Sequence, residues 1–240
     1  MNNWLERTEL LLGAAKLEQL KGANVLIAGL GGVGGYAAEM LCRAGIGRMT
    51  IVDGDVVGLS NINRQLIANQ YNVGNSKCAE FEKRLKSINP DLVLTVVDKF
   101  VDEESFGELL DSSSFDYVVD AIDTLSPKVA LIKESLDRKI PLVSSMGAGA
   151  KTDPCLLEIC DISKSHHCPL AHMLRKRLSR IGIKTGFRVV FSPEPVREGS
   201  MILCEERNKK SNVGTISYMP PLFGIYCASV VIRDLLGEMN

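Results

Sequence analysis

The sequence predicts an α/β fold: a Rossmann-like, doubly wound and mostly parallel sheet with a C-terminal α+β extension of the same core. Three observations support this fold class. Short runs of β-branched residues alternate with segments whose apolar residues recur at helical spacing. The short runs are apolar at consecutive positions, which is typical of strands buried on both faces of a parallel sheet. A glycine-rich turn joins the first run to the first helical segment, as in nucleotide-binding sheets.

The first 150 residues contain five strand segments separated by helices. A buried strand is expected at 24–28, and a helix with small residues facing the sheet at 33–44. Pro127 lies in the first turn of a later helix at 126–137, where proline is well tolerated. The other expected strands are 49–53, 92–100, 117–121 and 141–145, and the other expected helices are 76–88 and 103–110.

The pattern changes after Gly149. A strand is expected at 155–162, followed by a basic amphipathic helix at 169–182. Two more strands are expected at 187–192 and 200–205, and a last helix within 218–236. We therefore divide the chain into a nucleotide-binding core, residues 1–150, and an extension, residues 151–240, that packs on the same core.

Composition limits the classes of function. The 240 residues carry a formal net charge of −1 and are 45% hydrophobic, as in an ordinary globular protein. A nucleic acid or a membrane would have to be met by a local patch of charge. The segment 218–236 holds two prolines and an Arg–Asp pair, so we expect a helix docked on the core and no stable transmembrane insertion; a position peripheral to a membrane is the alternative.

The cysteines and the N-terminus indicate a cytoplasmic protein. The chain begins without the apolar core of a signal peptide, and its seven cysteines form no C-x-x-C pair. An odd number of unpaired thiols is typical of a reducing compartment. The cluster His166, His167 and Cys168 lacks a second ligand pair, so a polar loop is favoured over a metal site there.

The turn "VLIAGLGGVGGYAAEML" has the composition of a phosphate-binding loop. Its four glycines, Gly29, Gly31, Gly32 and Gly34, would let phosphate oxygens approach backbone N–H groups at a helix N-terminus. Hydride-transferring enzymes use nearly the same loop, so the glycines do not separate NAD from ATP. Asp53, about twenty residues further on, is placed to accept hydrogen bonds from ribose hydroxyls. Asp55 is either a second contact of this kind or a solvated loop acid.

Later residues favour ATP. "LSNINRQL" places Asn61, Arg64 and Gln65 directly after the second strand, where a dehydrogenase needs no polar cluster. Lys77 begins the next helix, where its charge opposes the helix dipole, and this placement suggests another use. Arg64 and Lys77 together would neutralise a triphosphate.

The segment "DAID" supplies two carboxylates at the end of the fourth strand. Carboxylates in this position suit Mg²⁺, a hard cation that also bridges phosphates. Asp123 is the stronger candidate for the metal ligand, because Asp120 can serve instead to brace the loop.

These motifs resemble the ThiF/MoeB/HesA superfamily, the bacterial relatives of ubiquitin-activating enzymes, which adenylate a carboxylate with ATP and Mg²⁺. The resemblance covers roughly residues 20–150 and includes "DGD", "SNINRQ", "GNSK" and "DAID" in order. It implies that Asp53 holds the ribose and that Asp123 holds Mg²⁺. It further implies that Asn61, Arg64 and Lys77 hold phosphates.

Further segments, among them "CRAGIG", "DAIDTLSPK", "IPLVSSMGAGAKTDP" and "VGTISYMPPLFG", resemble the tRNA threonylcarbamoyladenosine dehydratase branch over nearly the whole chain. This resemblance implies an enzyme that adenylates the threonylcarbamoyl carboxylate on tRNA and closes it to a cyclic form with loss of water. The superfamily resemblance also implies a homodimer, in which an arginine of one subunit reaches the triphosphate of the other. Arg7 is the only candidate for that arginine, and a solvated helix charge is its alternative role.

The alternative function is adenylation of the C-terminus of a ubiquitin-like sulfur carrier or a peptide, with a sulfur-transfer partner protein. The absence of C-x-x-C zinc pairs weakens that reading. A nucleotide-binding scaffold without catalysis is disfavoured, because a scaffold has no need of Arg64, Lys77 and Asp123. The loop 144–150 is either a monovalent-cation site or a flexible active-site loop.

A basic helix suggests how tRNA would be held. "RKRLSR" contains four cations, and phosphate contact is their functional interpretation, with a solvated helix face as the alternative. The four residues are Arg175, Lys176, Arg177 and Arg180.

Overall fold

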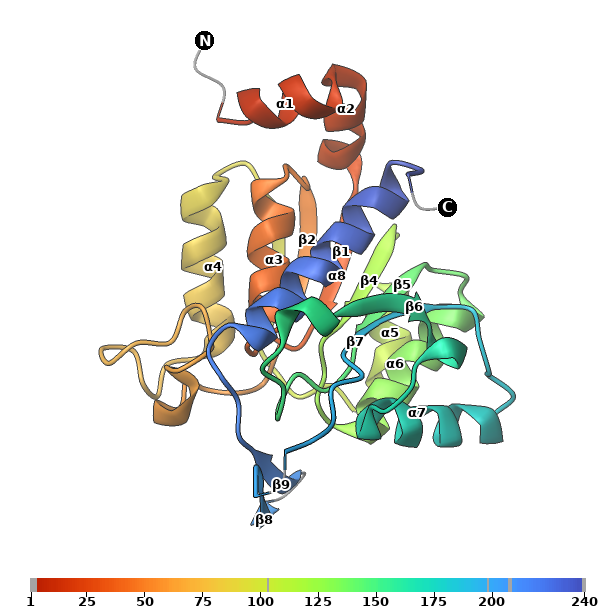
Figure 1. Cartoon of the computed structure of the whole chain (residues 1–240). Coiled ribbons are helices and arrows are strands. Elements are labelled where there is room, and N and C mark those ends of the chain that lie inside the picture. The colour runs from red at the N-terminus through yellow and green to blue at the C-terminus, as the bar shows by residue number, and fades with distance from the viewer. Residues whose placement is uncertain (1–3, 103, 198, 207–208, 239–240) are drawn as a thin grey trace.

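A seven-stranded sheet forms the centre of the computed structural model, which describes residues 4–102, 104–197, 199–206 and 209–238 (Figure 1). The strand order is β3–β2–β1–β4–β5–β7–β6, and every neighbouring pair is parallel except β6 and β7. The expected mostly parallel, doubly wound sheet is therefore confirmed. The strands are β1 (Asn24–Ala28), β2 (Arg48–Val52), β3 (Val93–Val97), β4 (Tyr117–Asp120), β5 (Leu142–Ser145), β6 (Glu158–Asp161) and β7 (Arg188–Phe191).

Helices cover both faces of this sheet. One apolar cluster joins Val25 and Ile27 of β1 to α3 (Gly34–Arg43), α4 (Lys77–Ile88) and α8 (Met219–Leu235). The other joins Leu26 and Ala28 of β1 to α5 (Ser105–Asp111), α6 (Leu125–Asp137) and α7 (Pro169–Arg180). Successive side chains of a strand point to opposite faces, so the continuous apolar run of β1 supplies both cores.

The two edge strands depart from the expectation that the strands are buried on both faces, since no residue of β3 or β6 is buried. β3 pairs only with β2 and lies at the edge of the sheet, and Val93 is 61% exposed. The expectation was wrong for β3 because an edge strand has a neighbour on one side only. The strand is also shorter than the expected 92–100.

The C-terminal extension belongs to the same core. β6 and β7 continue the sheet, and α8 packs closely on α3. At their contact, a Cβ on Gly224 would lie 2.2 Å from the backbone oxygen of Val33, so only glycine lets the two helices approach this far. The expected docking of 218–236 on the core is confirmed, and no helix in the described part of the chain is long and apolar enough to cross a membrane.

Two helices precede the sheet and a hairpin follows it. α1 (Glu6–Leu12) and α2 (Ala14–Gly22) lie beside the amino ends of the strands (Figure 1). The loop that joins β2 to α4 lies at the opposite end, beside the carboxyl ends of the strands. β8 (Met201–Glu206) and β9 (Lys209–Val213) form a separate antiparallel pair.

Candidate functional site

The glycine-rich turn packs backbone against backbone. Gly29 has a φ of +90°, and a Cβ on this residue would lie 2.8 Å from the backbone oxygen of Ala121. A Cβ on Gly34 would lie 1.8 Å from the backbone oxygen of Gly29. Since α3 begins at Gly34, the turn presents the free N–H groups of a helix N-terminus, which is a favourable environment for an anion.

Asp53 is fixed beside this turn. Its Oδ2 accepts a hydrogen bond from the N–H of Leu30 at 2.6 Å, and its Oδ1 accepts one from the N–H of Asp55 at 2.8 Å. Burial raises the pKa of the Asp53 carboxyl, while the nearby Lys77 and the N–H donors act in the opposite direction. A carboxylate oxygen has two lone pairs, so both oxygens can still accept a hydroxyl group.

Lys77 is buried in an acidic environment. Its side chain is 5% exposed, and its Nζ lies 2.7 Å from Oδ2 of Asp55 and 3.9 Å from Oδ2 of Asp53. This pairing explains how a lysine can begin α4 against the helix dipole. In the structure, therefore, Asp55 is the partner of Lys77, and the role of Lys77 as a phosphate ligand stays a prediction.

Arg64 lies against the glycine turn. Its Nη1 donates to the backbone oxygen of Ser60 and to Oδ1 of Asn63, both at 2.8 Å. A Cβ on Gly32 would lie 3.3 Å from Cγ of Arg64. Burial lowers the pKa of Arg64, and the negative charge of Asp123 opposes that shift. The fold thus brings Arg64 and Asp123 within electrostatic reach, although 58 positions separate them in the chain.

The other amides after β2 have distinct roles. Oδ1 of Asn61 accepts the N–H of Gly58 at 2.9 Å, which holds the 3₁₀ helix Leu59–Asn61. Gln65 is 7% exposed, and its Oε1 has no hydrogen-bond partner. Its Nε2 is the nearest atom to a Cβ built on Gly31, at 3.8 Å. A buried, unpartnered acceptor beside a phosphate-type loop is a feature that a bound ligand would explain.

The two acids of "DAID" have different environments. Asp123 is exposed after β4, whereas Asp120 has no exposed surface and forms an ion pair with Lys128 at 2.8 Å. The described part of the chain contains no group of three or more His, Cys, Asp or Glu residues that could hold a metal ion. Asp123 therefore offers a single carboxylate to a metal, which suits Mg²⁺ carried by phosphates, because Mg²⁺ is usually held by one or two carboxylates and the substrate.

Two features of the site were missed from the sequence. Pro220 reaches the glycine turn from the first turn of α8, and its Cβ would lie 2.9 Å from a Cβ on Gly32. Lys128, the partner of Asp120, is completely buried. The sequence signal that could have revealed Lys128 was a lysine inside the apolar pattern of 126–137.

The structure does not bring Arg7 to these residues within one chain. Arg7 is exposed on α1, beside the amino ends of the strands, while the glycine turn lies at their carboxyl ends (Figure 1). Its predicted role would require a second subunit. Cys227 is buried on α8, and burial raises the pKa of its thiol to about 12.

The basic residues of α7 divide into two sets. Lys176, Arg177 and Arg180 are exposed, while Arg175 is half-buried and donates from Nη1 to the backbone oxygen and the Oγ of Ser165. Arg177 donates to Oγ of Ser126 on α6 at 2.7 Å, three residues after Asp123. This contact connects the basic helix to the first turn of α6, which directly follows the loop that carries Asp123.

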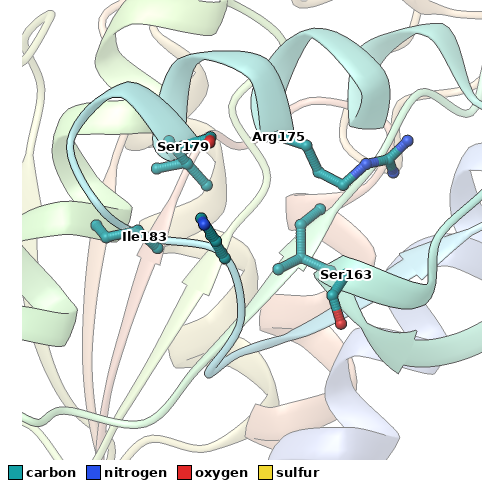
Figure 2. Close-up of a pocket in the computed structure, with 7 residues that line it drawn as sticks. Ser163, Arg175, Ser179 and Ile183 are labelled. Atoms are coloured by element: carbon teal, nitrogen blue, oxygen red, sulfur yellow. The ribbon is translucent and has the colours of Figure 1, made fainter.

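A small pocket lies beside α7. Figure 2 shows Ser163, Arg175, Ser179 and Ile183 around it, and its volume is about 230 Å³. That is less than the roughly 300–1,000 Å³ of ordinary small-molecule sites. None of its lining residues belongs to the glycine turn or to the loops after β2 and β4, so it is separate from the candidate site.

Comparison with known proteins identifies the family. Residues 5–240 match the model of the ThiF family. The chain belongs to the ThiF family. A tRNA threonylcarbamoyladenosine dehydratase of Bacillus subtilis is 39% identical to this ThiF-family chain, over 100% of the chain and 97% of the relative.

Two further comparisons place this ThiF protein among its relatives. The crystal structure of Escherichia coli tRNA N6-threonylcarbamoyladenosine dehydratase in complex with ATP matches it with a TM-score of 0.89 and 34% identity, over 99% of this chain and 97% of that one. A molybdopterin-synthase adenylyltransferase of E. coli is 36% identical, but over only 53% of this chain and 50% of the relative. The expected superfamily and its dehydratase branch are confirmed as the proteins that this chain resembles.

Proposed function

We propose that this protein is an ATP-dependent dehydratase that acts on threonylcarbamoyladenosine in tRNA and closes its side chain to a cyclic form. The observation that carries the proposal is the end-to-end match with proteins of that name, which includes the extension after residue 150. The candidate site supports the same chemistry, because a phosphate-type turn, a guanidinium and an exposed carboxylate meet at the carboxyl edge of the sheet.

The chemistry requires activation of a carboxylate. A carboxylate is a poor electrophile, since its leaving group would be oxide. Transfer of AMP from ATP to the carboxylate releases pyrophosphate and turns the oxygen into a good leaving group. A carbamoyl nitrogen or oxygen of the same side chain can then attack at high effective molarity, with loss of AMP. The net change in the tRNA is the loss of one water molecule, and no acyl-carrying cysteine is needed.

The described residues fit ATP. The glycine turn offers backbone N–H groups to phosphates, and Asp53 keeps lone pairs for ribose hydroxyls. The unpartnered Oε1 of Gln65 beside Gly31 provides a further hydrogen-bond acceptor, which an O–H or N–H group of the nucleotide could fill. In this proposal Asn61, Arg64 and Lys77 hold the phosphates, and Asp123 holds Mg²⁺, which neutralises phosphate charge when bound.

The remaining partners are proposals of the same kind. A homodimer would allow Arg7 of one subunit to reach the site of the other. A monovalent cation near 144–150 and a cytoplasmic location complete the proposed setting, and a sulfur-transfer partner protein would go with the second candidate function. Adenylation of a ubiquitin-like carrier is the second candidate, and the half-length match to an adenylyltransferase is what favours it.

One experiment separates the two candidates. Purified protein is incubated with ATP, Mg²⁺ and bulk tRNA from a strain that lacks the activity, and the digested nucleosides are analysed by mass spectrometry. The dehydratase proposal predicts a nucleoside that has lost one water molecule. Unchanged nucleosides, together with ATP–pyrophosphate exchange that depends on a carrier protein, would favour the second candidate.

Replacement of Arg175, Lys176 and Arg177 by alanine is expected to weaken tRNA binding and to spare ATP binding. Each lost phosphate contact should reduce the slope of log affinity against log salt by roughly 0.7–0.9. Arg175 also holds Ser165, so the single variants of Lys176 and Arg177 isolate the contribution of the exposed cations. Filter binding across a salt series measures the effect.

The matched control replaces Lys16, Lys83 and Lys133, three exposed lysines on other helices, by alanine. This variant has the same change in net charge. If both triple variants bind tRNA with the affinity and salt dependence of the wild type, α7 is not part of the RNA interface.

A further inference from the structure

Lys128 and Asp120 form an ion pair with no exposed surface under the candidate site. Nζ of Lys128 lies 2.8 Å from Oδ2 of Asp120, and both side chains are 0% exposed. Removing two charges from water is costly, and an apolar pair of similar volume often stabilises a fold equally well. Stability alone is therefore a weak explanation for this pair, and its contacts indicate what it does.

The pair holds both polar backbone groups of Ile122, the residue directly before Asp123. Oδ1 of Asp120 accepts the N–H of Ile122 at 3.1 Å, and Nζ of Lys128 donates to the backbone oxygen of Ile122 at 2.8 Å. Oγ of Ser144 on β5 donates to Oδ2 of Asp120 and fixes the carboxylate to the next strand. The backbone that leads into Asp123 is thus held by side chains from β4 and α6.

The same loop forms the floor of the glycine turn. The N–H of Ala121 donates to the backbone oxygen of Ala28 at 2.9 Å. Cβ of Ala121 would lie 3.0 Å from a Cβ on Gly34. The backbone oxygen of Ala121 would lie 2.8 Å from a Cβ on Gly29. The loop that carries Asp123 therefore lies directly against the phosphate-type turn, so its position sets where Asp123 stands relative to that turn.

We propose that Lys128 and Asp120 are positioning residues that fix Asp123 relative to the glycine turn, and so determine how strongly Mg²⁺ contributes to ATP binding. Neither side chain can reach a ligand, because both are completely buried. They act through Ile122 on the exposed Asp123. This inference rests on the proposed use of ATP and Mg²⁺. It adds Lys128, to which the sequence interpretation gave no function, and makes the loop-bracing role considered for Asp120 specific to Asp123.

The test uses the double variant Lys128→Met/Asp120→Asn, which removes both charges and leaves side chains of similar shape and size. Calorimetry measures ATP affinity with Mg²⁺ and with EDTA. We expect the gain in affinity caused by Mg²⁺ to fall by about tenfold or more, as when the residues that orient a metal ligand are lost. ATP affinity in EDTA should change less than twofold. A general loss of stability would instead weaken ATP binding both with Mg²⁺ and with EDTA.

The control Lys133→Met/Asp137→Asn makes the same substitutions in an exposed ion pair on α6, and it should leave the Mg²⁺ gain unchanged. A folded double variant with the wild-type Mg²⁺ gain would overturn the inference. A wild-type protein that binds ATP equally with Mg²⁺ and with EDTA would instead contradict the proposed role of the metal.

A second measurement does not depend on the folding of the variant. In the ligand-free wild-type protein, the Ile122 amide should exchange with solvent slowly, because Asp120 already accepts its hydrogen. Exchange as fast as in an unprotected loop would show that the segment is not held before the ligand arrives, and would overturn the inference.

Discussion

Replacement of Asp123 by alanine is expected to lower turnover by about 10²–10³-fold while the protein stays folded. Effects of this size follow the removal of a preorganised group that acts on charge in the transition state. Asp123 is exposed at the end of β4 and faces the charge of Arg64, so the substitution removes a site carboxylate without opening the core. Turnover of tRNA in the presence of saturating ATP measures the effect, and circular dichroism reports the fold.

The control for this variant is Asp137→Ala, which removes an exposed acid from the other end of α6. It should retain the turnover of the wild type. If Asp123→Ala also turned over at a near-normal rate, the assignment of Asp123 as the metal ligand would be wrong, and Mg²⁺ would have to be held elsewhere.

The Gly34→Ala variant is expected to lose most of its ATP binding and part of its stability. A Cβ at this position would lie 1.8 Å from the backbone oxygen of Gly29, so the turn has to open to admit a methyl group. Overpacking of this kind costs about 1–3 kcal/mol, which corresponds to a fall in Tm of roughly 2–12 °C for a chain of this length. Calorimetry with ATP and a thermal scan measure the two effects.

Gly22→Ala is the matched control, because a Cβ on Gly22 would meet no atom within 4 Å and the residue ends α2 away from the site. It should bind ATP as the wild type does. Wild-type affinity in the Gly34→Ala variant would mean that the close packing of the turn is not needed to hold phosphates.

The order of the elements could be predicted because each strand and helix has its own local signal. The apolar run of β1 and the helical spacing in α4 and α6 come from periodicities that need no knowledge of distant residues. The edge position of β3 could not be predicted in the same way. Its residues are as apolar as those of β1, and only the pairing of strands decides which one has a free side.

The candidate site was predictable as a set of motifs and less so as a set of contacts. The glycines, Asp53, Arg64 and Asp123 come from segments whose strand ends must meet at one edge of a parallel sheet, so their proximity followed from the fold class. The pairing of Lys77 with Asp55 did not follow. It depends on where the helix start lies relative to the loop after β2, to within a few ångströms.

The sequence by itself determined the fold class, the family and the nature of the ligand-binding edge, because these depend on periodicity and on motif order along the chain. Only the tertiary structure decided which acid of "DAID" is exposed and which is buried against Lys128, and it alone brought Pro220 to the glycine turn. The physical reason is that ionic and packing contacts act over a few ångströms between residues far apart in the chain. Sequence spacing places such residues at the same edge of a sheet, but packing decides which of them touch.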